Sequence, residues 1–346
     1  MSKLIDFKVP YSKNAYKLSL QNRKVYKYVG ITYYMYFKDK TIKGRKYRYA
    51  TRSVRLPNGK IVSLEVIYKN QSKEELEKIF DDKEKNENVK YVLKISKPDY
   101  IFSLEEYRKI ESIKVDYRKI LRRLSKVSLK DLFDRFTANF TYESNALEGN
   151  SLTLKDVAIV MFENASIKGK DLREIYETRN SRIVVELIMK NQFSVSEEDI
   201  IRMHKILVRD TGVREGYKIV PNVIVGRNLE TTLPENVGRE IGRLIKWYHE
   251  NKSKLHAIKI ATLFHGKFEQ IHPFEDGNGR VGRFLINIIL SSNKYPPLII
   301  RKSQRISYLN ALENFDKKHP DTLERFILER FKETYKKFFE MYVKYI

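Results

Sequence analysis

Residues 272–283 read HPFEDGNGRVGR and bring a histidine, acidic side chains, two glycines and two arginines into one short stretch. Arginine donates paired hydrogen bonds to phosphate oxygens, and aspartate is an oxygen ligand of the kind that Mg2+ binds. Histidine titrates near neutral pH and therefore suits a general base. The stretch predicts a site that holds a nucleoside triphosphate and uses its phosphate chain. A plain polar turn between two core helices is the alternative.

The turn formed by Gly277, Asn278 and Gly279 precedes apolar residues at helical spacing, so it opens a second helix. Glycines let the backbone approach a ligand closely, and successive N–H groups form an anion-binding concavity. A helix N-terminus adds positive partial charge. Arg280 and Arg283 are three residues apart, so both are expected on one helical face, where they can reach phosphate oxygens.

This stretch resembles the signature of the Fic family, H-x-F-x-D/E-G-N-G-R-x-x-R. Every specified position is filled by the expected residue type: His272, Phe274, Asp276, Gly277, Asn278, Gly279, Arg280 and Arg283. Eight matched positions make a chance match very rare. The resemblance extends over about residues 133–315 and implies a protein adenylyltransferase that uses ATP and Mg2+.

In the mechanism implied by the resemblance, His272 deprotonates a Tyr, Thr or Ser hydroxyl of a target protein. The oxygen attacks the α-phosphorus of ATP, and pyrophosphate leaves. Asp276 holds Mg2+ against the phosphates, while Asn278 and the flanking glycine backbone stabilise charge on the α-phosphate. Arg280 and Arg283 bind the β- and γ-phosphates.

A second segment, SNALEGN at residues 144–150, resembles the inhibitory helix motif of Fic proteins, S/T-x-x-x-E-G/N. Ser144, Glu148 and Gly149 fill its positions, at the end of a predicted inhibitory helix over about 128–150. The resemblance implies that Glu148 pairs with Arg283 and so occupies the group that binds the γ-phosphate. Misplacing reacting atoms by about 1 Å lowers a rate by on the order of 100-fold. A simple helix stop at Gly149 is the alternative reading.

Residues 211–234 are rich in glycine and proline and contain a short β-like run at 220–225. In the Fic fold, a β-hairpin flap at this place docks the target segment by strand addition. Because strand addition uses backbone hydrogen bonds, it depends little on the sequence of the target. Val223, Ile224 and Val225 are the candidate docking edge. The alternative is an ordinary surface loop.

Apolar periodicity predicts helices through most of the second half. Tyr308 lies where the family often places a tyrosine near the adenine pocket. The other histidines carry no motif, and His204 and His265 are expected to be packed or surface residues. The periodicity predicts a mainly α fold class, and the resemblance implies a Fic-type bundle with a small hairpin flap. The predicted helices cover 154–162, 172–189, 196–208, 237–249, 254–270, 281–289, 307–314 and 322–343.

The first hundred residues form a separate β-containing domain, 1–100, followed by the helical domain, 101–346. Strands are predicted near 25–37, 46–56 and 61–68, with a hairpin turn at 57–59. A short helix at 72–82, a mobile connector at 83–90 and a longer helix at 104–124 follow. The basic, tyrosine-rich sheet has two interpretations. It could bind nucleic acid, or it could pack on the rest of the protein with its lysines in solvent, and the second interpretation is favoured.

Composition limits the class of protein. The 346 residues include no cysteine and carry a net charge of +24, which predicts salt-sensitive attraction to acidic partners. No run of about 18 apolar residues is present, so no membrane helix is expected. Residues near the N-terminus lack the apolar core of a signal peptide, and cytoplasm is the default location. No Cys or His cluster has the spacing of zinc ligands.

Three functions therefore compete. A self-inhibited adenylyltransferase acting on an unidentified target protein leads. The second uses the same site to remove AMP, with Glu148 positioning a water, or to transfer another nucleotide. The third is a nucleic-acid binder built on the basic sheet. Fic proteins often form dimers, so the resemblance also implies a homodimer.

Overall fold

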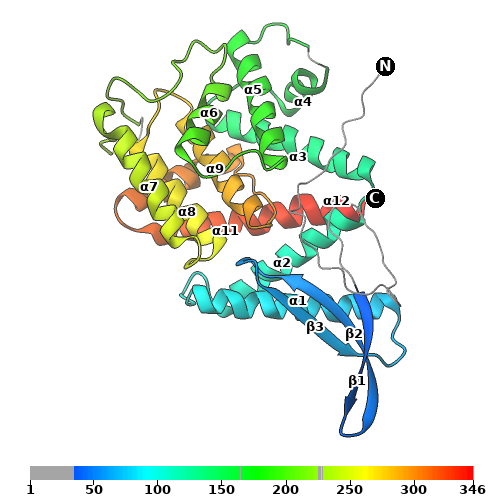
Figure 1. The fold of residues 1–346 in the computed structure, drawn as a ribbon. Coiled ribbons are helices and arrows are strands. Elements are labelled where there is room, and N and C mark those ends of the chain that lie inside the picture. Colours follow the sequence, from blue (N-terminus) through cyan, green and yellow to red (C-terminus); the bar gives the residue numbers. More distant parts are fainter. Residues whose placement is uncertain (1–34, 164, 225–226, 228, 346) are drawn as a thin grey trace. The chain divides into compact units, whose positions relative to one another are not determined.

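The computed structural model describes residues 35–345 apart from 164, 225–226 and 228 (Figure 1). The chain divides into two compact units after Asn88. Most of the predicted first strand, residues 25–34, lies outside the described residues. No helix in the described part is both long and apolar enough to cross a membrane.

The N-terminal unit contains a three-stranded antiparallel sheet in the order β1-β2-β3. Its strands are β1 (Met35–Ile42), β2 (Arg45–Arg55) and β3 (Ile61–Ile67). Lys43 and Gly44 join the first two strands, and both have positive φ, as a tight two-residue hairpin requires. The predicted turn at 57–59 joins the other pair, where Gly59 also has positive φ.

Helix α1 (Lys73–Ile95) places Leu76 and Phe80 in a small core with Ala50, Val54 and Leu64 of the sheet. Beside this core, the buried Arg52 bonds to Asp81 at 3.0 Å and to Glu84 at 2.8 Å. On the sheet, Glu65 pairs with both Lys38 and Lys40. Part of the positive charge of the strands is therefore neutralised within the unit.

The predicted connector at 83–90 is wrong, and so is the early end of the preceding helix, because α1 continues without a break to Ile95. In the middle turns of α1, Glu84 and Asn88 lie on the inward face of the helix and are buried. Polar residues at these positions interrupt the apolar period that identifies a helix. Glu84 is accommodated there by its ion pair with Arg52.

The second unit is helical, as predicted. Two short irregular turns, Ile159–Glu163 and Tyr335–Glu340, continue α4 and α11 with wider π-type winding. The helices are α2 (Leu104–Arg123), α3 (Lys126–Leu147), α4 (Leu154–Ala158), α5 (Leu172–Met189), α6 (Glu197–Leu207), α7 (Val237–Asn251), α8 (Ala257–Ile271), α9 (Asn278–Ser292), α10 (Arg305–Asp316), α11 (Pro320–Thr334) and α12 (Met341–Lys344).

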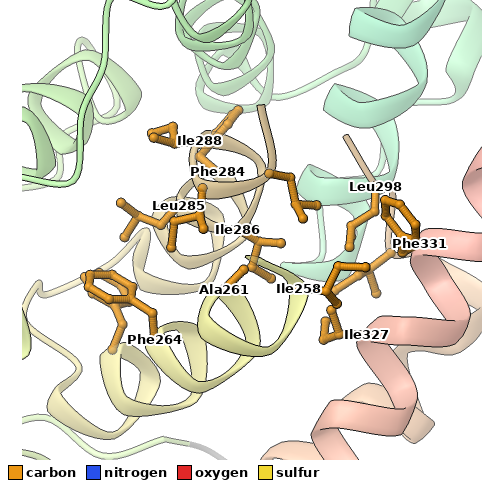
Figure 2. Close-up of a cluster of buried hydrophobic side chains, with 14 of the residues drawn as sticks. Ile258, Ala261, Phe264, Phe284, Leu285, Ile286, Ile288, Leu298, Ile327 and Phe331 are labelled. Carbon is orange, nitrogen blue, oxygen red and sulfur yellow. The ribbon is translucent and has the colours of Figure 1, made fainter. Parts of the chain in front are cut away.

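Helix α9 is the centre of this unit. It contacts α3, α5, α6 and α8 (Figure 1), and most of its residues are buried, including the polar Arg280, Arg283 and Asn287. Figure 2 shows Ile286 of α9 beside Ala261 of α8, and Phe284 of α9 and Ile327 and Phe331 of α11 belong to the same cluster. Burying each such side chain contributes about 1.5–3 kcal/mol. The loop between α8 and α9 is therefore held between two rigid helices.

Candidate active site

The loop that joins α8 to α9 carries the residues of the HPFEDGNGRVGR stretch. At the end of α8, His272 adopts a left-handed backbone with φ 49°. Gly277, with φ 84°, begins α9 and takes a conformation that glycine adopts without strain. Asn278 closes the loop, since its side chain accepts from the Phe274 N–H at 2.9 Å and donates to the Phe274 carbonyl at 2.8 Å. The Asn278 side chain thus holds the loop in shape.

His204 of α6 anchors the same loop from outside it. Its ring stacks on Phe274 with 3.8 Å between ring centroids. Its Nδ1 accepts from the Gly216 N–H at 3.3 Å, so Nε2 carries the proton and donates to the Asp276 carbonyl at 3.0 Å. Burial lowers the pKa of His204 to about 4, which keeps the ring neutral. His204 is packed, as predicted, but its link to the loop was not foreseen.

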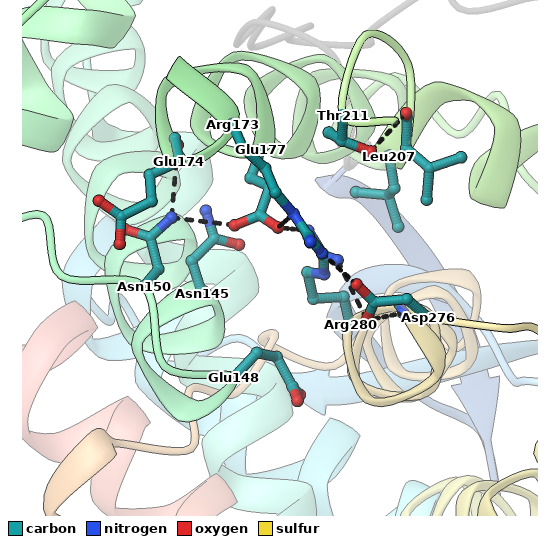
Figure 3. Close-up of polar contacts among 12 residues, drawn as sticks. Asn145, Glu148, Asn150, Arg173, Glu174, Glu177, Leu207, Thr211, Asp276 and Arg280 are labelled. Atoms are coloured by element: carbon teal, nitrogen blue, oxygen red, sulfur yellow. Dashed lines mark hydrogen bonds and ion pairs between the residues drawn. The ribbon is translucent and has the colours of Figure 1, made fainter. Parts of the chain in front are cut away.

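Asp276 and Arg280 belong to a charged cluster at the start of α9 (Figure 3). Arg173 of α5 pairs with the Asp276 carboxylate, while Glu177 lies 3.3 Å from both Arg173 and Arg280. Asn150 donates to Glu177 at 3.1 Å. Arg280 is almost fully buried, so the carboxylates of this cluster fix the orientation of its side chain.

The Asp276 side chain is 41% exposed and fits a metal ligand that completes its shell with phosphate oxygens and water. Across the described part of the chain, no group of three or more His, Cys, Asp or Glu side chains is arranged so that it could hold a metal ion. A metal ion at Asp276 would therefore depend on the phosphates for most of its ligands.

Arg283 is buried, and its contacts come from the end of α3. Its Nη2 lies 2.7 Å from Glu148 Oε1 and donates to the Ser144 carbonyl at 2.8 Å, while Nε donates to Ser144 Oγ at 3.1 Å. Glu148 caps α3, and Gly149 follows with φ 100°. Any side chain at Gly279 would overlap Glu148 Oε1. Ser144, Glu148 and Arg283, which sequence reasoning grouped together, thus meet within one chain.

The side chain of His272 is 17% exposed. Burial, with the nearby positive charges of Lys218 and Arg227, lowers its pKa to about 4. The ring is therefore neutral near pH 7 and can accept a proton.

The segment before α7 is tied to the site loop. Lys218 donates its backbone N–H to Pro273 at 2.9 Å, and its ammonium bonds to Asn222 at 2.7 Å and Thr231 at 2.9 Å. Asn222 in turn donates to the Phe274 carbonyl at 2.8 Å. Burial lowers the pKa of Lys218 to about 8.

Of the predicted docking edge, Val223 is 81% exposed and forms a single antiparallel bridge with Glu230. Ile224 is half-buried, and Val225 lies outside the described residues. The predicted β run at 220–225 is wrong for its described residues, which form this bridge and no strand. Pro221 offers no N–H for a ladder.

Tyr308, the expected adenine-pocket residue, is buried, and its hydroxyl lies 2.8 Å from His265 Nε2. Sequence reasoning missed several residues that shape the site because they belong to no local motif. They are Arg173, Glu177, Lys218, Arg227 and Glu269.

Comparison with known proteins gives consistent similarities. Residues 194–290 match the Fic/DOC family. The chain is 31% identical over 177 residues to Protein adenylyltransferase Fic of Drosophila melanogaster, a match that covers 50% of this chain and 36% of that protein. It is 30% identical over 218 residues to the Drosophila virilis protein of that name, covering 62% and 43%. The chain thus spans less than half the length of these relatives.

Among solved structures, a Fic domain containing signaling protein from Bacteroides thetaiotaomicron matches with a TM-score of 0.61 and 25% identity, over 66% of this chain and 94% of that one. Fic-1 from C. elegans (residues 134–508) matches with a TM-score of 0.57 and 21% identity, over 68% of this chain and 71% of that one. The second likeness concerns the fold alone.

Proposed function

Because the chain carries a Fic domain, matched over residues 194–290, we propose that it is a self-inhibited protein adenylyltransferase. It transfers AMP from ATP to a hydroxyl group of a target protein. The observation that supports this best is the joint placement of His272, Asp276, Arg280 and Arg283 around one loop between two buried helices. The relatives that match the chain carry the name protein adenylyltransferase.

His272 acts as the general base. Its neutral ring takes the proton of the target hydroxyl, and a bond forms between that oxygen and the α-phosphorus of ATP. The bond between the α-phosphorus and the bridging oxygen to the β-phosphate breaks, and pyrophosphate leaves. The His272 imidazolium afterwards releases its proton to water.

The N-terminus of α9 binds the phosphates. The N–H groups of Asn278 and Gly279 lie at the helix start, where an anion is favoured, while the Gly277 N–H donates to the Asp276 carboxylate. Arg280 and Arg283 supply fixed positive charge for the β- and γ-phosphates. Asp276 would hold Mg2+, which when bound neutralises developing charge on the phosphate oxygens.

Glu148 inhibits the enzyme by occupying Arg283. The pair at 2.7 Å uses the guanidinium that the γ-phosphate needs, and Ser144 accepts further hydrogen bonds from Nε and Nη2 of the same group. ATP bound without Arg283 has its α-phosphorus out of line with the attacking hydroxyl. Removal of Glu148 from this place is the activating step.

Transfer of label from α-32P-ATP to protein tests the proposal, with Mg2+ present and with three proteins compared. These are the unaltered chain, Glu148→Gly, and Glu148→Gly combined with His272→Ala. Strong labelling in Glu148→Gly alone supports transfer, inhibition and the role of His272. Absence of ATP binding in every protein rejects the proposal.

The competing hydrolytic function uses the same site and is separated by a second assay. If Glu148 positions a water, the unaltered chain releases AMP from a modified target and Glu148→Gly does not. For the nucleic-acid function, the pairing of Lys38 and Lys40 with Glu65 leaves less positive charge free for phosphates, which favours a sheet that serves the protein's own packing.

A further inference from the structure

Glu269 of α8 is a buried carboxylate that lies one helical turn before His272. The side chain is almost fully buried. Its Oε2 is 3.9 Å from His272 Nδ1, and its Oε1 is 4.0 Å from His265 Nδ1. His265 Nε2 meets the Tyr308 hydroxyl at 2.8 Å. One carboxyl group thus stands between two imidazole rings.

None of the three facing atoms makes a hydrogen bond of good geometry among the described residues: Glu269 Oε1, His265 Nδ1 and His272 Nδ1. The nearest backbone groups are those of Glu269 for His272 and of Gly282 for His265, and both act to raise the pKa of the ring beside them. A buried polar atom without a partner costs on the order of 1–3 kcal/mol. The space is confined, because a Cβ on Gly282 of α9 would lie 2.6 Å from Glu269 Oε1 and 2.7 Å from His265 Nδ1. An arrangement that is unfavourable for folding and adjacent to the general base points to a use in the reaction.

We propose that Glu269 is a positioning residue for His272, an inference that rests on the adenylyltransferase function proposed above. Its carboxylate faces His272 Nδ1 and keeps the ring proton there, so that Nε2 is the nitrogen that accepts the proton of the target hydroxyl. The separation of 3.9 Å closes to a hydrogen bond when substrates are bound. The carboxylate then stabilises the imidazolium that forms.

The charges around Glu269 support this role. Burial and the Glu148 carboxylate raise the pKa of Glu269 to about 7, with a smaller contribution from Asp316, while Arg227 and Arg283 act in the opposite direction. The neighbouring His265 and Tyr308 are held neutral, because burial lowers the pKa of the first to about 3 and raises that of the second. Glu269 is therefore the group of this cluster that titrates near neutral pH.

The Glu269 carboxyl group couples the inhibitory Glu148–Arg283 pair to the general base, His272. With Glu148 on Arg283, the nearby negative charge favours the protonated form of Glu269. When Glu148 leaves, that repulsion ends and Glu269 ionises more readily. The movement that frees Arg283 for phosphate thus also prepares His272 to accept a proton.

The test compares Glu148→Gly with the double variant Glu148→Gly/Glu269→Gln, by the pH dependence of AMP transfer. Gln has nearly the same shape, but its amide can donate to Nδ1 and so favours the tautomer with its proton on Nε2, which cannot act as the base. We expect the rate at pH 7.5 to fall by about 100-fold, the low end of what a general base contributes. In Glu148→Gly, the rate should decline at low pH as Glu269 is protonated. We expect this decline to be absent from the double variant.

Glu324→Gln in the same background is the matched control. Glu324 on α11 is also buried, and burial likewise raises its pKa to about 7, but it faces Lys259 at 3.7 Å. This control should keep both the rate and the pH profile of Glu148→Gly. An unchanged profile in the Glu269 variant, or equal losses in both variants, overturns the positioning role.

A readout without turnover separates this proposal from the enzyme function. Nitrogen NMR of the six histidines reports the tautomer of His272 directly. In folded Glu148→Gly, the His272 proton should reside on Nδ1, and Glu269→Gln should shift it toward Nε2. If the tautomer shifts but no variant transfers AMP, the positioning role stands and the proposed function fails. If the tautomer does not shift, the positioning role fails.

Discussion

Glu148 and Arg283 form an ion pair of 2.7 Å within a single chain, joining the end of α3 to the second turn of α9. The guanidinium is buried, while the carboxylate side chain is 40% exposed. The exposed partner can therefore leave without unfolding the core, and the buried partner stays in place to meet a phosphate. The asymmetry fits a reversible block.

Glu148→Gly should raise AMP transfer by on the order of 100-fold, because Arg283 then becomes available to orient the triphosphate. The measurement is incorporation of α-32P label at saturating ATP. Glu174→Gln is the control, since this carboxylate binds Ser151 and leaves Arg283 untouched. Equal labelling in the unaltered chain and in Glu148→Gly contradicts the inhibitory role.

Gly279→Ala should destabilise the inhibited state, because the added methyl group would overlap Glu148 Oε1 and lie 2.9 Å from Arg283 Nη1. We expect a loss of about 1 kcal/mol in the free energy of unfolding, the low end for overpacked sites, because the exposed Glu148 side chain can move aside. The loss should be smaller by about 0.5 kcal/mol or more when Glu148 is also glycine, since contacting residues are energetically coupled. Urea unfolding of the four proteins measures this coupling, and additive effects would mean that Glu148 does not occupy this place.

Acid should destabilise the fold partly through His204. Its pKa is about 4 in the folded chain and about 6.5 when unfolded, so the unfolded chain binds more protons between these values. Stability from this group is therefore complete above pH 6.5 and is lost as the pH falls toward 4. Between pH 7 and pH 5 the loss should be about 2 kcal/mol.

Comparison with His204→Gln isolates this contribution from those of Glu269 and Glu324, whose raised pKa values act with the opposite sign. The variant should lose less stability than the unaltered chain between pH 7 and pH 5. Parallel losses in both proteins would show that His204 is protonated in the folded state.

Arg227→Ala should weaken the segment that precedes α7. Arg227 pairs with Asp316 at 2.6 Å, and the two side chains are 3% and 7% exposed. Removing one member of a buried pair leaves an uncompensated charge and costs about 3–5 kcal/mol. Arg227→Ala combined with Asp316→Ala should recover part of that loss in thermal or urea unfolding. A double variant as unstable as the sum of the singles counts against a direct pair.

Most of the helical fold was predictable because its signal is local. Apolar residues at helical spacing identify α5, α8 and α9, whose buried faces come from consecutive turns. The prediction failed in α1, where Glu84 and Asn88 take inward positions. No local rule anticipates a buried glutamate there, because its stability depends on Arg52 from a strand.

By itself, the sequence determined which side chains meet at the loop, because His272, Asp276, Arg280 and Arg283 are close along the chain and any fold that starts a helix after Gly277 brings them together. The resemblance also paired Glu148 with Arg283 in advance. Only the tertiary structure decided which groups surround them. His204, Glu177 and Glu269 act on the loop through contacts between different helices or through burial. The protonation state of a buried side chain follows from the charges packed around it, and those are set by the fold.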